Sequence, residues 1–263
     1  LTGQLNTYEY SGIKGLRQQG FQETDIVAMA KPITKYAVQI RNPEDIVEEL
    51  NKAYHIATTG RRGPVLIDLP MNIQRSEVEN PVYDMTFEDK HTDAAAAQQA
   101  ADTILEALEQ AKRPVINAGN GIRIGKAFDV FTRVVKKLGI PVVTGWNSID
   151  CMYDTDPLYV GRAGHMGDRA GNFAVQNSDL LLSLGSRLSI RQVGYNYPTW
   201  ARAAYVIYND IDAEELKKPT VHVDMPVHAD VKDLLEKLEL VLDEEEFDPN
   251  GGAKDKEAVD SWI

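Results

Sequence analysis

The chain has 263 residues, of which 43% are hydrophobic, and its formal net charge is −12. The length exceeds that of a typical single domain, so we expect two domains, and the acidic balance argues against binding to nucleic acid or to an anionic membrane through a basic surface. The single cysteine cannot form an intrachain disulfide and no apolar run reaches the roughly 18 residues of a membrane span, which together favour a cytoplasmic protein.

The N-terminal part predicts a small α/β unit. Residues 1–20 are rich in Gly, Gln and Tyr and are predicted to be loop. Alternating apolar residues at 34–40 predict a strand. A helix follows, with Asn42 as its N-cap and Pro43 at its first position. The nearly continuous apolar run at 65–70 predicts a buried parallel strand.

A second unit is expected after a linker. Residues 75–93 hold Pro81 and several charges without a sustained period, and they are longer than a usual connection, so we interpret them as crossing between domains. A helix is predicted at 94–110. The apolar run 114–118 then leads into the turn Gly119-Asn120-Gly121 and a further amphipathic helical pattern, which together predict the start of a βαβ unit.

This glycine turn departs from the usual dinucleotide fingerprint. Gly119 and Gly121 match the first glycines of G-x-G-x-x-G, but the third position is Ile124, and the next strand, at 141–144, has no acidic residue at its end. A standard NAD site is therefore disfavoured. Two interpretations stay open, a ligand held by backbone N–H groups or glycines needed only because the turn is tight.

The later strands also end in glycine or polar residues. After an irregular stretch at 145–172, strands are predicted at 180–184 and 204–208, with a short edge strand at 222–224 and a closing helix at 231–242. Because parallel strands present their carboxyl ends at one edge of a sheet, we expect these ends to converge on one ligand crevice. The histidines are scattered, so no metal site is predicted in the chain.

Three motifs resemble those of the acetolactate synthase large subunit and its relatives, the thiamine-diphosphate (ThDP) enzymes of the pyruvate oxidase group. Residues 58–70 (TTGRRGPVLIDLP) resemble the family's TTGRPGPVLxDxP. Residues 21–23 (FQE) with 31–35 (KPITK) resemble FQE…(K/R)P(V/I)TK. Residues 176–179 (QNSD) followed by 185–187 (GSR) resemble (H/Q)NADLxxxxGxR, and order and spacing agree over residues 1–242.

The resemblance implies a fold class and domain boundaries. The expected fold is α/β, with a parallel sheet covered by helices on both faces. Residues 1–78 correspond to the C-terminal part of the pyrimidine-binding (PYR) domain and residues 94–242 to the central FAD- or nucleotide-binding-like domain. Residues 79–93 are a linker, and residues 243–263 a linker towards a pyrophosphate-binding (PP) domain. We expect a piece of a longer protein, because the family's activating glutamate and metal motif have no counterpart in this sequence.

The resemblance also implies the chemistry. It implies an enzyme that uses ThDP and Mg²⁺ to decarboxylate a 2-keto acid and to join the resulting carbanion to a second carbonyl. In the family the cofactor lies between two subunits, so a homodimer or homotetramer is expected. Gln22 is expected to line the active site. Its neighbour Glu23 either shares that role or only starts a short helix at Thr24.

In the acetolactate synthase branch the central domain binds FAD. A flavin dinucleotide needs close backbone at its diphosphate, arginines, and carboxylates for its ribose hydroxyls. By the resemblance, the residues that contact it are Arg61, Gly119, Gly121, Gly164, His165, Gly185, Arg187, Asp210 and Asp212. The chain departs from the family at Leu188-Ser189-Ile190, where the family has F-D-D, and at Met71, where it has lysine. These departures point away from the ordinary acetolactate substrates.

Two alternatives remain beside this assignment. Asp210 and Asp212 could equally end a strand and cap a helix that begins at Ala213-Glu214. The whole chain could also be a non-catalytic nucleotide-binding or structural module that keeps the same sheet. Residues 1–78 argue against such a module, because a free-standing nucleotide-binding domain has no need of them.

Overall fold

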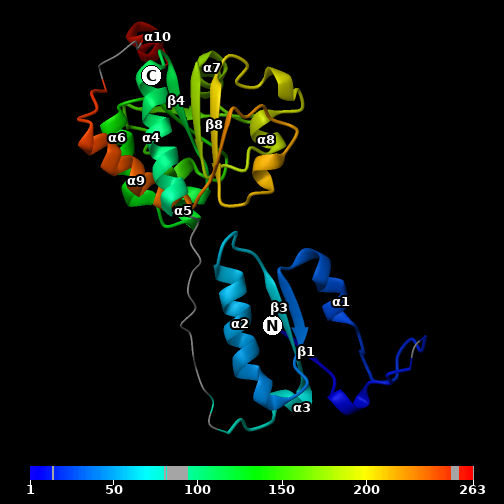
Figure 1. The fold of residues 1–263 in the computed structure, drawn as a ribbon. Coiled ribbons are helices and arrows are strands. Elements are labelled where there is room, and N and C mark those ends of the chain that lie inside the picture. The colour runs from blue at the N-terminus through cyan, green and yellow to red at the C-terminus, as the bar shows by residue number, and fades with distance from the viewer. Residues whose placement is uncertain (14, 80, 82–93, 250–254, 263) are drawn as a thin grey trace. The chain divides into compact units, whose positions relative to one another are not determined.

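The computed structural model describes residues 1–13, 15–79, 81, 94–249 and 255–262, and the chain divides into two compact units, residues 1–90 (unit 1) and 91–263 (unit 2) (Figure 1). Both units consist of parallel strands with helices, which confirms the α/β fold class. The linker expected at 79–93 lies outside the described residues, apart from 79 and 81. Within the described ranges, every helix is too short or too polar to cross a membrane.

Unit 1 is built on a three-stranded parallel sheet with the order β1-β3-β2. The helix expected at Pro43 begins as a 3-10 turn with Asn42 at its N-cap position, as predicted. The Asn42 side chain makes no capping hydrogen bond to the backbone and instead donates to Asp45 Oδ2 at 3.0 Å. The strands are β1 (Thr2–Gln4), β2 (Tyr36–Gln39) and β3 (Val65–Pro70), and the helices are α1 (Ile26–Ala30), α2 (Ile46–Thr58) and α3 (Met71–Gln74).

A single buried carboxylate joins the three strands of unit 1. Asp68 in the central strand β3 is fully buried. Its Oδ1 accepts a hydrogen bond from Thr2 Oγ1 in β1 at 2.9 Å, and its Oδ2 accepts one from Gln39 Nε2 in β2 at 2.8 Å. Buried polar groups are stable only when they are paired. Asp68 therefore fixes which residues of the two edge strands lie beside it.

Unit 2 is built on a six-stranded sheet with the order β6-β5-β4-β7-β8-β9, in which every neighbouring pair is parallel. The strands at the centre, β4 and β7, consist of buried residues throughout. This burial is expected for parallel strands covered on both faces. The strands are β4 (Pro114–Ala118), β5 (Val142–Thr144), β6 (Tyr159–Arg162), β7 (Leu180–Leu184), β8 (Tyr205–Asp210) and β9 (Met225–His228).

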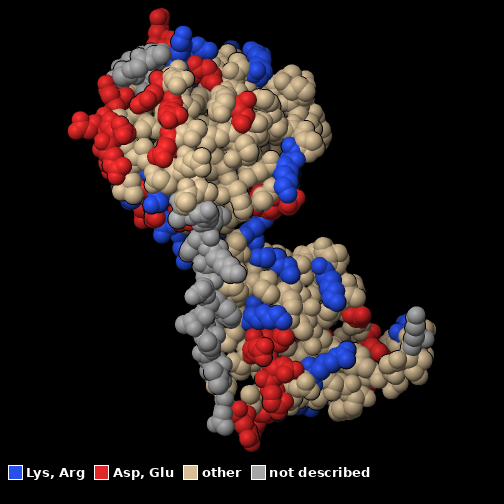
Figure 2. All heavy atoms as spheres, viewed as in Figure 1, with Lys and Arg blue, Asp and Glu red and all other residues tan. Residues whose placement is uncertain are grey.

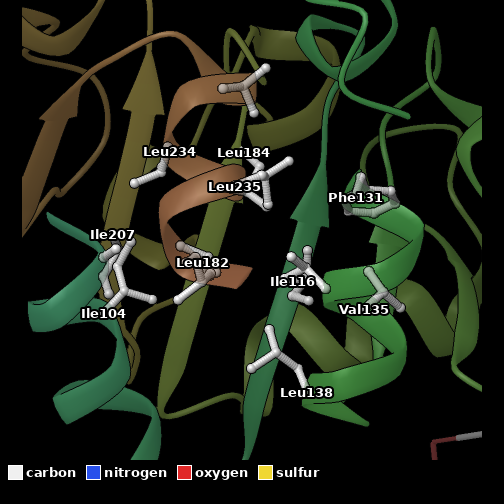
Figure 3. Close-up of a cluster of buried hydrophobic side chains, with 14 of the residues drawn as sticks. Ile104, Ile116, Phe131, Val135, Leu138, Leu182, Leu184, Ile207, Leu234 and Leu235 are labelled. Atoms are coloured by element: carbon white, nitrogen blue, oxygen red, sulfur yellow. The ribbon is translucent and has the colours of Figure 1, made fainter. Parts of the chain in front are cut away.

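Helices cover both faces of this sheet, and the apolar side chains of β4, β5, β7 and β8 alternate between two cores. Ile116, Leu182 and Ile207 pack with the long helices α4, α6 and α9 (Figure 3). Their neighbours Val115 and Leu181 pack on the opposite face, with residues of α7 and α8. The helices are α4 (Ala94–Gln110), α5 (Gly121–Ile124), α6 (Phe128–Leu138), α7 (Arg169–Asn177), α8 (Ile190–Val193), α9 (Val231–Glu244) and α10 (Lys256–Asp260).

The helices α6 and α9 carry charged side chains on the surface that faces away from the sheet. Acidic residues gather on the side of unit 2 where α6 and α9 lie (Figure 2). There Glu239 accepts two hydrogen bonds from Arg133, at 2.8 and 2.9 Å, and Asp243 pairs with Lys137 at 2.6 Å. These exposed ion pairs join α6 to α9 but contribute little to stability in water.

Several elements of unit 2 differ from the sequence expectations. The strand expected at 222–224 forms at Met225–His228, because the Asp224 carboxylate accepts the Val206 N–H at 2.7 Å in place of a backbone carbonyl. The edge strand β6 lies in the stretch expected to be irregular, and α10 lies in the stretch expected to be linker. The helix after the glycine turn is split into α5 and α6 at Lys126, whose φ is 56°.

Candidate functional site

The carboxyl ends of the unit 2 strands form one edge of the sheet, here called the carboxyl edge. The ends of β4 and β7 lie side by side at its centre, because these strands pair in register from Pro114 with Leu180 to Ala118 with Leu184. The candidate residues of unit 2 follow β4, β6 and β7 or lie at the end of β8. The parallel topology therefore brings them to the same edge.

The three glycines at the centre of this edge pack directly against one another. A Cβ atom on Gly119 would lie 2.3 Å from Gly185 O, and one on Gly121 would lie 2.7 Å from Gly185 Cα. The N–H of Gly119 donates to Leu184 O at 2.9 Å, and the N–H of Gly121 donates to Gly185 O at 2.8 Å. Close packing of two loops accounts for all three glycines, and both N–H groups are already used within the chain.

The residue between the first two glycines is different. The N–H of Asn120 is not donated to any described residue, and Asn120 precedes α5 as its N-cap without a side-chain capping hydrogen bond. A backbone N–H at this edge is a suitable donor for an anionic group. Asn120 was not singled out from the sequence, where it stands only as the middle residue of the turn.

Arg187 follows β7 and extends from the carboxyl edge. Its side chain is 66% exposed, and its Nε lies 3.4 Å from Oε1 of Glu215. Lys218 Nζ lies 2.6 Å from Oε2 of the same glutamate and also donates to Arg187 O. Glu215 thus holds the two cations together while much of the Arg187 side chain stays open to solvent.

Asp210 and Asp212 shape the turn that leaves β8. Asp210 Oδ1 accepts the N–H of Asp212 at 2.9 Å, and Asp212 Oδ1 accepts the N–H of Glu214 at 3.0 Å. Tyr208 OH donates to Asp210 Oδ2 at 3.3 Å. Both carboxylates therefore accept backbone N–H groups within the turn, while the 3-10 helix that follows begins only at Glu215, with Glu214 at its N-cap position.

Gly164 and His165 lie in a loop that is fixed to α8. Gly164 has a φ of 120°, and a Cβ on it would lie 2.6 Å from Arg191 O, so glycine is required both for the backbone conformation and for space. His165 N donates to that same carbonyl at 2.8 Å, and its side chain is exposed. Asn172 exchanges hydrogen bonds with Gly164 at 2.9 and 3.1 Å.

A network of polar side chains joins α8 to the strands β4 and β7, and it was not predicted from the sequence. Gln192 Nε2 donates to Asn117 Oδ1 at 2.5 Å, and Ser186 Oγ donates to Gln192 Oε1 at 2.7 Å. Asn117 Nδ2 donates in turn to Ser183 Oγ at 2.9 Å. The only signal in the sequence is the presence of Asn117 within an otherwise apolar run, and that signal does not reveal its partners.

In unit 1, Arg61 lies in the exposed loop between α2 and β3. Lys35 holds the start of this loop, because its Nζ donates to Ile56 O at 2.5 Å and to Thr59 O at 2.9 Å. Its side chain also packs under Gly63, where a Cβ would lie 3.0 Å from Lys35 Cδ. The two motifs at 31–35 and 58–70 are thus in direct contact.

Gln22 lies at the tip of a turn in unit 1 and has a φ of 66°, a conformation uncommon for a residue with a side chain. The neighbouring Phe21 is 84% exposed. Glu23 closes the turn, since its Oε2 accepts the N–H groups of Gln19 at 2.7 Å and Gly20 at 3.2 Å, and these hydrogen bonds lower the pKa of Glu23. Glu23 does not start the helix that follows, which begins at Ile26.

The remaining chemistry of the described residues is limited. Among them, no group of three or more His, Cys, Asp and Glu could hold a metal ion. Cys151 is buried, and burial raises the pKa of its thiol to about 11, so the thiolate needed for nucleophilic chemistry is scarce at neutral pH.

An all-parallel sheet with helices on both faces and with glycine and polar loops at its carboxyl edge defines a doubly wound α/β domain. Residues 101–238 match the family described as "Thiamine pyrophosphate enzyme, central domain", and the chain belongs to this family.

Several curated relatives are similar to the chain over most of its length. It is 36% identical to the acetolactate synthase large subunit of Lactococcus lactis over 86% of the chain and 39% of the relative. It is 31% identical to a probable acetolactate synthase large subunit of Methanococcus aeolicus over 100% of the chain and 43% of the relative. A similar protein of Methanocaldococcus jannaschii is 37% identical over 90% of the chain and 40% of the relative. The chain thus spans about two fifths of the length of these relatives.

Proposed function

We propose that the chain is part of a ThDP-dependent enzyme that resembles acetolactate synthase, decarboxylates a 2-keto acid and forms a carbon–carbon bond. The observation that carries this proposal is the extent of the similarity. The relative from Methanococcus aeolicus matches the whole chain, and therefore unit 1 as well as the central domain of unit 2. A free-standing nucleotide-binding module would need only the second unit.

When bound, ThDP supplies an ylid that adds to the keto acid and an electron sink for the loss of carbon dioxide. In this proposal, the chain contributes Gln22 to that site. The turn closed by Glu23 holds Gln22 in a fixed backbone conformation at an exposed tip, where its amide can donate to a carboxylate or accept from a hydroxyl. Mg²⁺ would be held by residues outside this chain.

The finer proposal is that unit 2 holds FAD at its carboxyl edge. The polar groups there fit a dinucleotide in part. The open N–H of Asn120 and the exposed Arg187 can donate to a diphosphate, and the carboxylates of Asp210 and Asp212 can accept from ribose hydroxyls. Because the N–H groups of Gly119 and Gly121 are used within the chain, these glycines contribute close packing and not hydrogen bonds. Gly164, His165 and Gly185 would shape the loops around the ligand.

The proposal extends to the organisation of the protein. Residues 1–78 would be the C-terminal part of a PYR domain, residues 94–242 the central domain and residues 79–93 a linker. Residues 243–263, which include the short helix α10, would be a connecting segment. The enzyme would be a cytoplasmic homodimer or homotetramer, since the family's ThDP site needs two subunits. The substrate would be a small 2-keto acid related to pyruvate.

The test uses the full-length protein with ThDP, Mg²⁺ and a set of small 2-keto acids that includes pyruvate, and measures carbon dioxide release together with the condensed product. Activity that disappears on dialysis against a chelator and returns only with both ThDP and Mg²⁺ supports the proposal. A protein that turns over no 2-keto acid under these conditions supports the alternative, a non-catalytic nucleotide-binding or structural module.

FAD is tested separately by the absorbance spectrum of the purified protein, followed by acid release of any chromophore. A flavin band with released FAD supports the finer proposal. A colourless protein that keeps its ThDP-dependent activity rejects FAD while leaving the enzymatic proposal intact.

A further inference from the structure

Gln192 joins the loops of four neighbouring strands at the carboxyl edge. Its amide bonds to Asn117 in β4 and to Ser186 after β7, at 2.5 and 2.7 Å. Its side chain also lies beside the end of β5, since a Cβ on Gly145 would lie 3.5 Å from Gln192 Nε2. The loop after β6 packs on its backbone, where a Cβ on Gly164 would lie 2.9 Å from Gln192 Cα.

The partners of Gln192 are deeply buried, so its hydrogen bonds are obligatory. Asn117 and Ser183 are 0% exposed and Ser186 is 5% exposed. Without Gln192, the buried Asn117 carbonyl oxygen would lose its hydrogen-bond partner within the protein, which is unfavourable for a buried polar group. The chain Ser186–Gln192–Asn117–Ser183, here called the Gln192 network, therefore forms as a unit.

The network controls the position of the segment that carries two arginines. Between Ser186 and Gln192 the chain passes through Leu188, which has a φ of 47°, so the backbone turns sharply as it leaves β7. Arg187 and Arg191 lie on this segment and are both exposed. The hydrogen bond from Ser186 to Gln192 closes the segment into a loop, and the bond to Asn117 attaches that loop to the centre of the sheet.

We propose that Gln192 is a positioning residue, which holds the segment 187–191 on the carboxyl edge and so places Arg187 and Arg191 where an anionic nucleotide binds. The role in binding rests on the nucleotide site proposed above. The attachment of the segment does not, because it follows from the hydrogen bonds alone.

The test compares Gln192→Leu with Ser186→Ala and with the double variant, in the full chain. Gln98→Leu is the matched control, because Gln98 Nε2 also makes an amide hydrogen bond, to Asp102 Oδ1 at 3.0 Å, but on the exposed surface of α4. Two readouts are taken under native conditions. One is the rate of tryptic cleavage after Arg187 and Arg191 relative to cleavage after Arg133 in α6, and the other is the affinity for FAD and for ADP.

The expected result is faster cleavage after Arg187 and Arg191 in Gln192→Leu, by about tenfold if local opening becomes easier by the equivalent of one lost buried hydrogen bond. Cleavage after Arg133 and the Gln98→Leu control should stay unchanged. Ser186→Ala should show a smaller increase, and the double variant should resemble Gln192→Leu, because both residues belong to one network. Nucleotide affinity should fall with Gln192→Leu but not with Gln98→Leu.

Two results would overturn the proposal. Unchanged cleavage at both arginines would mean that Gln192 does not hold the segment, and an equal increase after Arg133 would mean general loosening of the unit. If cleavage rises locally while neither the unaltered chain nor the variants bind a nucleotide, the attachment by Gln192 stands and the nucleotide site fails.

Discussion

Gly121 and Gly185 are in direct backbone contact, since the N–H of Gly121 donates to Gly185 O at 2.8 Å. The two residues are so close that a Cβ on Gly121 would lie only 2.7 Å from Gly185 Cα. Gly121→Ala should therefore force two loops apart and lower the free energy of unfolding by about 1–3 kcal/mol. Gly3→Ala is the control, since the atom that a Cβ on Gly3 would meet is the Gln74 side-chain nitrogen at 3.4 Å, which is an ordinary contact. Urea unfolding followed by circular dichroism measures both. Equal stability of the two variants would contradict the close-packing interpretation of the glycine turn.

Asp68 holds the three strands of unit 1 together through Thr2 and Gln39. Asp68→Ala should destabilise unit 1 by about 2–4 kcal/mol, because two hydrogen bonds to a carboxylate are lost. Thr2→Val removes only one of them and should have roughly half that effect. Amide hydrogen exchange resolves the two units, and protection should fall in β1, β2 and β3 while unit 2 keeps its protection. A loss spread equally over both units would argue against this local role.

Lys35 fixes the loop that carries Arg61 by binding two carbonyl groups at the end of α2. Lys35→Met should increase tryptic cleavage after Arg61 and Arg62 by about tenfold, since each hydrogen bond from a charged donor contributes ~1.5 kcal/mol or more. Lys31→Met makes the same change in charge on an exposed residue nearby and serves as the control. If Lys31→Met gives the same increase, the effect comes from charge and not from the hydrogen bonds.

Arg162 lowers the pKa of Asp168 through a bidentate pair, with Asp168 also accepting the Arg162 N–H at 2.8 Å. A carboxyl whose pKa is lowered by folding stabilises the native state above its unfolded pKa, and this contribution is lost as the pH falls through the folded pKa. The turn between β6 and α7 should therefore keep its order at neutral pH and lose this support only in acid, below about pH 4. A carboxyl titration followed by nuclear magnetic resonance tests this, and Arg162→Leu should raise the Asp168 midpoint.

Gln22 is held at an exposed tip by the turn that Glu23 closes. If it lines the active site, Gln22→Ala in the full-length protein should lower kcat/KM for the 2-keto acid about tenfold or more, with unchanged folding. Gln19→Ala changes an exposed glutamine of the same loop and should leave the activity unaltered. Equal activity of both variants would remove Gln22 from the proposed site.

Much of the fold could be predicted because it depends on local patterns. The apolar runs of β3, β4 and β7 and the periodic helices α4 and α9 are visible in the sequence, since burial on one or both faces dictates which positions are apolar. The edge strand β6 was not predicted, and the edge strand β9 was predicted a few residues too early. Their positions depend on pairing with β5 and β8, and short edge strands carry little hydrophobic pattern of their own.

The sequence by itself determined the family, because the order and spacing of the motifs can be compared directly. It also determined which residues meet at the carboxyl edge, because strands that alternate with helices form a parallel sheet whose strands end at the same edge. Only the tertiary structure decided how those residues are used. The N–H groups of Gly119 and Gly121 are taken by the end of β7, and Asn117 finds its partner Gln192 far along the chain. Hydrogen bonds between groups so distant in sequence leave no periodic signal, since they arise only when the sheet brings separate loops together.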